Sequence, residues 1–163
     1  MESYLSYLAG ILDGEGSIMV KKTTYRRRSE RWRDMISPEY FARVSVKNAN
    51  EEVIGLFEEN FGGRKWQDKR PYPSKGGFRT NKRMWCYEST CRQATNLVER
   101  LLPYLRIKKP QAEKIIELRE AKKRARASPR KKDETGFHGK PYRDETVAEF
   151  EKIYQEVKSL NGH

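Results

Sequence analysis

The stretch YLAGILDGEGSI at residues 7–18 constrains the fold of this chain more than any other segment. Apolar residues recur three and four positions apart, at Leu5, Leu8, Ala9 and Leu12. This spacing predicts a helix that begins near Ser3 and buries one face. Glu15 follows the C-terminus of that helix, where the helix dipole disfavours negative charge, and Asp13 adds a second carboxylate to the same turn. A cation at this helix end is the simplest explanation for two acids in such a place.

Two glycines give the same helix an unusual surface. Gly10 and Gly14 are four residues apart and therefore share a helix face. That face allows another backbone to approach closely, although Gly inside a helix costs about 1 kcal/mol relative to Ala. An ordinary core helix that ends at a Gly is the alternative that these residues alone leave open.

The charge of the chain indicates its kind of partner. Lys and Arg number 35 against 23 Asp and Glu, a net charge of +12, which predicts binding to a polyanion such as nucleic acid. The alternative is a surface rich in salt bridges, as in heat-adapted proteins. Three windows, residues 21–33, 64–83 and 106–132, hold 27 of the 35 positive side chains.

Length and composition narrow the class of protein further. The 163 residues predict a single domain, 1–163. The sequence contains no apparent signal peptide and no apolar run of transmembrane length, so we expect an intracellular protein, cytoplasmic or organellar, that is not secreted and has no membrane partner. Cys86 and Cys91 do not have the spacing of a zinc site and are expected to be free thiols.

Periodicity predicts an α+β domain in the order helix, hairpin, helix, hairpin, helices. The expected strands are residues 17–28, 39–47, 64–70 and 82–90, and the expected helices after the first are 50–61, 92–105, 110–126 and 144–160. Asn50 is the expected cap of the second helix. Residues 127–143 are expected to form an irregular basic connection.

Alternation along the strands predicts one apolar face and one basic face that reads DNA. The residues expected on the basic face are Lys21, Thr23, Tyr25, Arg27, Arg43, Ser45, Lys47, Lys65, Gln67 and Lys69, and Arg83 is added from a strand whose direction stays open. Arg or Lys to guanine and Gln to adenine are the contacts that base geometry favours. A solvated surface is the alternative, but such surfaces usually mix charges of both signs.

The segment Leu8–Gly16 resembles the LAGLIDADG motif of homing endonucleases, with Glu15 in place of the final Asp. The resemblance implies an antiparallel, saddle-shaped sheet in a core spanning residues 1–126, with the basic connection and an extra C-terminal helix in residues 127–163. It also implies a site-specific double-stranded DNA endonuclease that serves intron homing. Glu15 and the Gly14 carbonyl are then ligands of Mg²⁺ or another divalent cation such as Mn²⁺, and no small-molecule cofactor is expected.

A second segment, Leu102–Ala112, resembles the part of the single-motif branch that places a lysine near the active site. By this alignment Lys108 is catalytic. The family's third polar position falls at about Val46, with Lys47 and Asn48 adjacent, and stays unassigned. A basic loop between two helices is the alternative for this segment.

One motif implies a homodimer, because two carboxylates are needed to cut two strands. The expected interface consists of Leu8, Ala9, Gly10, Asp13 and Gly14, and the expected target is near-palindromic. The competing functions are an RNA maturase that assists splicing, a non-catalytic DNA-binding regulator and a basic ribosome-associated protein. Intact Glu15 and Lys108 favour cleavage over splicing alone.

Overall fold

The computed structural model describes residues 2–23, 38–68, 83–127 and 142–162 of the chain. These residues form five helices and one four-stranded sheet, which confirms the predicted α+β class. The helices are α1 (Glu2–Glu15), α2 (Glu51–Phe61), α3 (Cys91–Leu101), α4 (Lys109–Ala127) and α5 (Asp144–Leu160). The strands are β1 (Gly16–Thr23), β2 (Glu39–Asn48), β3 (Arg64–Asp68) and β4 (Met84–Thr90). None of the five helices combines the length and the apolar composition that crossing a bilayer requires.

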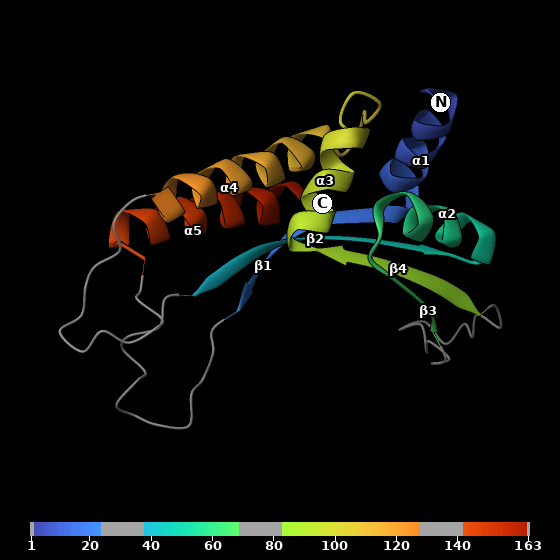
Figure 1. The fold of residues 1–163 in the computed structure, drawn as a ribbon, viewed down its shortest axis with the longest axis horizontal. Helices are drawn as coiled ribbons and strands as arrows, with labels where there is room; N and C mark the ends of the chain where they lie inside the picture. The colour runs from blue at the N-terminus through green and yellow to red at the C-terminus, as the bar shows by residue number, and fades with distance from the viewer. Residues whose placement is uncertain (1, 24–37, 69–82, 128–141, 163) are drawn as a thin grey trace.

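The sheet is antiparallel throughout and has the order β1-β2-β4-β3. Both predicted hairpins are present as strand pairs, and β2 and β4 join them at the centre. Figure 1 shows all five helices on one side of the sheet. We call the other side the open face, since no helix of the described residues covers it. The buried residues of β1 and β2 are all even-numbered and lie under the helices, so odd-numbered ones lie on the open face.

One core lies between the sheet and the helices. Tyr87 of β4 packs against Phe57 of α2, with ring centroids 5.4 Å apart. Tyr40 of β2 packs edge-on against Phe150 of α5 at 6.0 Å. Burial of each such side chain contributes about 1.5–3 kcal/mol. Helices from both ends of the chain therefore share a single apolar core with the sheet.

The ends of α2 follow the sequence closely. Asn50 Oδ1 accepts the Glu52 N–H at 2.8 Å, which confirms the predicted cap. Gly62 and Gly63 end the helix with φ angles of 66° and 102°, a region that favours glycine. The next helix is shorter than expected, because α3 ends at Leu101. Pro103 follows and has no N–H with which to continue the helical hydrogen bonds.

A cluster of polar side chains attaches α5 to the sheet. Glu151 accepts hydrogen bonds from Lys22 Nζ at 2.8 Å and from the Tyr40 hydroxyl, with Gln155 adding a third at 2.7 Å. The hydrogen bond from Lys22, followed by that from Tyr40, lowers the pKa of the Glu151 carboxyl to about 2. Burial, aided by the same carboxylate, raises the pKa of Tyr40 to about 12.

The residues after α5 reach the outer edge of the sheet. Asn161 Nδ2 donates to the backbone carbonyl of Ile18 in β1 at 2.9 Å. Gln111 of α4 donates to the carbonyl of Leu160 at 3.2 Å. The C-terminal end of α5 is thereby held against both α4 and the edge strand β1.

Candidate functional site

Glu15 is the last residue of α1, and its carboxylate is exposed where the helix meets the sheet. Gly16 makes this junction possible, because a Cβ there would lie 2.7 Å from the backbone oxygen of Leu12. The chain therefore turns from helix to strand directly after the acid. Asn48, the last residue of β2, donates its Nδ2 to Glu15 Oε2. The end of one helix and the end of one strand thus form the centre of the site.

A second hydrogen bond fixes the orientation of the Asn48 amide. Asn48 Oδ1 accepts the Asn50 N–H at 2.7 Å, which leaves Nδ2 to face Glu15. Local patterns in the sequence leave the third polar position unassigned. The signal that could have found it is strand pairing. Gly16 pairs with Val46, and Asn48 lies on the same face of β2 two residues on, next to the point where α1 ends.

Asp13 connects the end of α1 to the segment before α4. Its Oδ2 accepts the Arg106 N–H and its Oδ1 accepts the Lys108 N–H, both at 2.8 Å. The Lys108 ammonium group donates to the backbone carbonyl of Asp13. Carbonyls in the last turn of a helix lack helical partners, and a cation there offsets the helix dipole. The two predicted catalytic residues, Glu15 and Lys108, are therefore brought to the same end of α1.

One chain offers only part of a metal site. Glu15 and the Gly14 carbonyl are oxygen donors of the kind that Mg²⁺ prefers. Asp13 is buried beside them, and each of its carboxylate oxygens accepts a backbone N–H group from the segment at 106–108. Within the described ranges, no three His, Cys, Asp or Glu side chains lie close enough to hold a metal ion. The residues fit an ion that is completed by other ligands, such as substrate phosphates, and do not fit a closed site.

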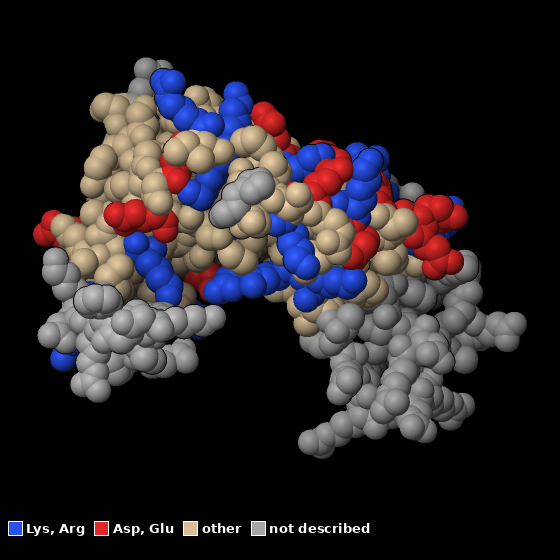
Figure 2. All heavy atoms as spheres, turned by 180° about the vertical axis from the view of Figure 1, so that it is seen from behind, with Lys and Arg blue, Asp and Glu red and all other residues tan. Residues whose placement is uncertain are grey.

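The open face presents five of the predicted DNA-binding residues from β1 and β2. They are Lys21, Thr23, Arg43, Ser45 and Lys47. Three further predicted residues, Tyr25, Arg27 and Lys69, lie outside the described part of the chain. Figure 2 shows Lys and Arg side chains along the lower border of the described residues, on the side of the open face.

The prediction for the third strand is wrong. Lys65 pairs with Tyr87, and Gln67 pairs with Trp85. Tyr87 is fully buried under the helices, so this pairing places both predicted residues on the helix side. Lys65 Nζ reaches Glu51 of α2 at 3.2 Å and lies 5.6 Å from the centroid of the Trp85 ring. Lys65 and Gln67 do not belong to the open face.

The open face of β3 carries Arg64, Trp66 and Asp68 instead. The Arg64 guanidinium stacks over the Trp66 ring, 4.7 Å from its centroid. Pairing with β4 sets this arrangement, because Arg64 lies opposite Glu88 and Trp66 lies opposite Cys86. Arg83 precedes β4 and is exposed.

Two ion pairs hold basic groups on the open face. Arg43 pairs with Glu88 of β4, and Lys47 Nζ lies 3.8 Å from Asp68 of β3. The Arg43 Nε is buried and has no hydrogen-bond partner within the described residues.

The exposed side of α1 is only partly the predicted interface. A Cβ added to Gly10 or to Gly14 would meet nothing within 4 Å, so this face is open. Leu8 and Ala9 are fully buried in the chain's own core and have no surface left for a partner. Asp13 is buried as well, against the segment at 106–108.

Next to the two glycines, the surface is hollow and partly apolar. A cavity of about 440 Å³ lies between α1 and residues 103–106. Tyr7 and Ile107, which are 50% and 71% exposed, are two of the large apolar side chains on the surface of the described residues. Exposed apolar groups around a concave surface are typical of a protein–protein contact.

Comparisons with known proteins give the fold. No protein-family model matches the chain. No curated protein matches it either. Among solved structures, the homing endonuclease I-CvuI in complex with DNA matches with a TM-score of 0.63 and 16% identity, over 98% of this chain and 82% of that one. The homing endonuclease I-TnaI matches with a TM-score of 0.57 and 11% identity, over 97% and 95% of the two chains.

A third match identifies the family whose fold these structures share. The LAGLIDADG homing endonuclease I-GzeII in complex with its DNA target matches with a TM-score of 0.53 and 13% identity. The match covers 96% of this chain and 43% of that one. The chain has the fold of the LAGLIDADG homing endonucleases, which confirms the resemblance drawn from Leu8–Gly16.

Proposed function

We propose that this chain is a site-specific endonuclease that cuts double-stranded DNA by metal-dependent hydrolysis. The observation that carries the proposal is the exposed Glu15 carboxylate, oriented by Asn48, at the point where α1 meets a sheet with an open basic face. I-CvuI, I-CeuI and I-Vdi141I, which share the fold, are described in complex with DNA. These descriptions support DNA as the partner.

Each residue at the helix end has a task in phosphodiester hydrolysis. A divalent cation bound by Glu15, the Gly14 carbonyl and substrate phosphates would activate water and neutralise charge on the phosphate. Asn48 holds the Glu15 carboxylate in one orientation. Lys108 supplies positive charge at the same helix end, where the phosphate gains negative charge in the transition state. I-CvuI complexes obtained with Mg or Ca support the use of a divalent cation.

Two copies of the chain would be needed to cut two strands. We infer a homodimer that pairs through the face of Gly10 and Gly14, since that face is open and close to Glu15 along the helix. Two-fold pairing brings the two α1 ends together and presents two open faces to one duplex. The target of such a dimer is near-palindromic.

Recognition of the target is assigned to the open face. Arg43 and Lys47 point away from the helices, and each would exchange an acidic partner on the sheet for a base edge or a phosphate. A bidentate contact between Arg and guanine contributes about 1–3 kcal/mol of discrimination. Glu88 and Asp68 hold these side chains until DNA replaces them.

Replacing Glu15 tests the catalytic assignment. Glu15→Gln removes the negative charge that binds the cation and leaves the shape of the site unchanged. We expect cleavage of the target in Mg²⁺ to be abolished, with DNA affinity within a few-fold of wild type. Gel analysis of cleavage and fluorescence anisotropy of binding measure the two properties separately.

Glu59→Gln is the matched control, because Glu59 is an exposed carboxylate in the last turn of α2 and has no part in the site around Glu15. It should cut at the wild-type rate. Wild-type cleavage by Glu15→Gln would show that another group binds the metal. Failure of the unaltered chain to cut any duplex that it binds would instead favour the regulator or the maturase.

A further inference from the structure

A cavity of about 360 Å³ lies between α3, α4 and one edge of β2. It exists because β2 extends beyond its neighbour. The β2–β4 pairing begins at Arg43 and Thr90, so the earlier residues of β2 have no β4 partner. The chain turns into α3 at Cys91, and α4 crosses above. The cavity is at the lower end of the size range of ligand sites.

The cavity reaches the open face of the sheet. Ala42 points to the helices and is buried, whereas Glu39 and Phe41 have the opposite parity and point to the open face. All three residues line the cavity. The cavity therefore opens at the strand edge and borders the surface that we assign to DNA.

Cationic side chains without an acidic partner line the cavity. Arg92 of α3 and Lys122 and Arg126 of α4 are in the lining, and the structure gives none of the three an ion pair within the described residues. Two other basic residues in the lining are already paired, Arg119 with Glu99 at 2.9 Å and Lys123 with Glu120 at 2.6 Å. Glu39 is the single acidic side chain among the lining residues.

The surroundings of Lys122 contain too little negative charge to balance its ammonium group. Burial lowers the pKa of its ammonium group, and Arg126 lowers it further, while Glu39 and Cys91 act in the opposite direction. The first turn of α3 contains no acidic residue, and Thr90 makes no capping hydrogen bond. The positive end of that helix therefore adds to the uncompensated charge. A bound anion would offset both.

We propose that Arg92, Lys122 and Arg126 bind a phosphate group in this cavity, and that the phosphate belongs to the backbone of DNA lying on the open face. The inference rests on the proposed DNA-binding function and extends the contact surface past the end of β4. Arg and Lys beside a shallow apolar floor suit a phosphodiester, whose charge faces the cations while its sugar contacts Phe41.

The salt dependence of DNA binding tests this site. Phosphate contacts do not depend on sequence, so a labelled duplex of arbitrary sequence is a sufficient probe. Removing one phosphate contact reduces the slope of log affinity against log salt by about one. The double variant Arg92→Ala/Arg126→Ala should then lose about fourfold less affinity than wild type between about 50 and 200 mM salt.

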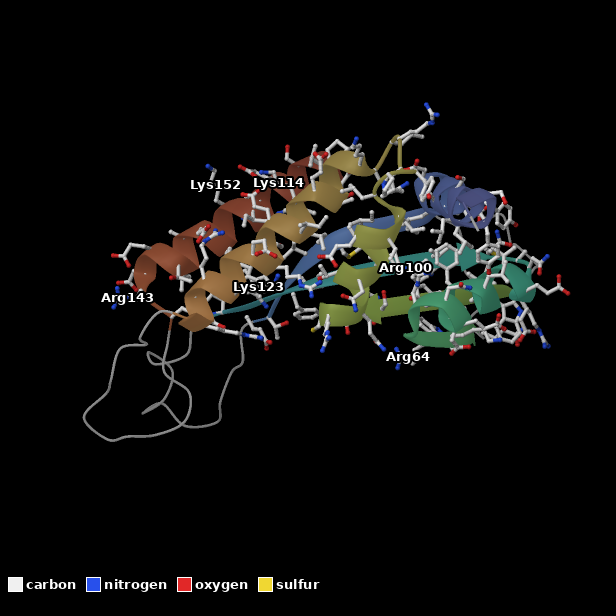
Figure 3. All side chains as sticks on the ribbon, turned by 45° about the horizontal axis from the view of Figure 1, so that its top comes forward. Arg64, Arg100, Lys114, Lys123, Arg143 and Lys152 are labelled. Atoms are coloured by element: carbon white, nitrogen blue, oxygen red, sulfur yellow. The ribbon has the colours of Figure 1, made fainter. Side chains whose placement is uncertain are left out.

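Lys152→Ala/Lys158→Ala is the matched control, because it removes two exposed charges from α5. Figure 3 shows Lys152 at the far edge of the helical layer, whereas Lys123 lies on the side of α4 next to the sheet. The control should keep the wild-type slope. Lys122→Met, which keeps the apolar stem, should lower the slope as the arginine variant does and should not lower the melting temperature.

Three results would overturn the proposal. An unchanged slope in the Arg92/Arg126 variant, with wild-type duplex binding intact, excludes the phosphate contact and leaves the endonuclease proposal standing. Calorimetric binding of free adenosine monophosphate that the variant loses, at an unchanged DNA slope, assigns the site to a free nucleotide. Absence of duplex binding by the wild type refutes the DNA source together with the proposed function.

Discussion

Asp13 and Glu15 are two residues apart at the end of α1, yet their surroundings give them different tasks. Asp13 is buried, and both of its oxygens accept backbone N–H groups from the segment at 106–108. Glu15 is exposed and accepts one hydrogen bond from a side-chain amide. A carboxylate that is satisfied on both oxygens holds structure, whereas one that is open on one side can bind an ion. We therefore regard Asp13 as the residue that positions Lys108.

Replacing Asp13 tests whether its carboxylate positions the segment that carries Lys108. In Asp13→Asn, one amide oxygen remains as an acceptor, and the amide N–H₂ group faces a second N–H donor. The buried mismatch costs about 1–3 kcal/mol, so the melting temperature should fall. Single-turnover cleavage should slow while DNA affinity is kept, because the loop that carries Lys108 loosens.

A double-mutant cycle with Lys108→Ala checks this reading. If Asp13 acts through Lys108, the combined variant should cut no more slowly than the slower single variant. Rate losses that multiply would mean that the two residues act independently.

At the residue scale, the sequence predicted the acids and the lysine but not the amide that faces Glu15. The glycine-acid-glycine pattern is local, and so is the basic segment around Lys108. Asn48 meets Glu15 only because β1 and β2 pair with Gly16 opposite Val46. Such a contact depends on register, which no local pattern in this chain specifies.

At the element scale, four strands and five helices were predicted near their observed positions, and the error lies in which side of β3 faces DNA. The segment RKWQD has polar residues at nearly every position, so alternation alone does not choose a face. Pairing with β4 chooses the face, because Lys65 aligns with the buried Tyr87, and the long Lys65 stem covers Trp85 while its charge reaches Glu51.

The attachment of α5 gives a prediction with a definite dependence on pH. The pKa of Glu151 is about 2 in the folded chain, below the ordinary value of 4.5. Its contribution to stability is therefore present above pH 4.5 and is lost as the pH falls toward 2. Glu151→Gln should lower the free energy of unfolding by about 1 kcal/mol at pH 7, a value reduced for solvent screening of a partly exposed group.

Urea unfolding at several pH values measures the effect. The difference between Glu151→Gln and wild type should shrink between pH 4.5 and pH 2. Glu149→Gln is the control, since Glu149 lies on α5 like Glu151 but forms an exposed ion pair with Arg124 of α4, and its loss should cost less than about 0.5 kcal/mol. An equal loss in both variants would remove the special role of the Lys22–Tyr40–Glu151 cluster.

At the scale of the whole molecule, the open side of α1 predicts how two copies meet. Gly10→Leu places a bulky side chain on a surface where, within one chain, a Cβ meets nothing within 4 Å. The folded monomer should keep its stability or gain about 1 kcal/mol, because Gly is a poor helix former. Association should be lost, since the two helices could no longer touch through their backbones.

Analytical ultracentrifugation distinguishes these outcomes when it is combined with thermal unfolding. Gly55→Ala on α2 is the control, because the nearest contact of its new Cβ is Lys65 Nζ at 3.9 Å, and it should associate as the wild type does. A wild-type monomer, or a Gly10→Leu variant that remains dimeric, would refute the interface.

The cover on the outer edge of β1 has a consequence for how the protein behaves at high concentration. An uncovered edge strand can recruit a strand from another molecule, and repeated recruitment leads to fibrils. In this chain, Asn161 occupies the Ile18 carbonyl, and α5 packs beside the same strand. A passing strand would have to displace that side chain before it could pair at Ile18. Two copies joined through α1 would thus keep two separate sheets, because neither β1 edge is free to pair with the other at Ile18.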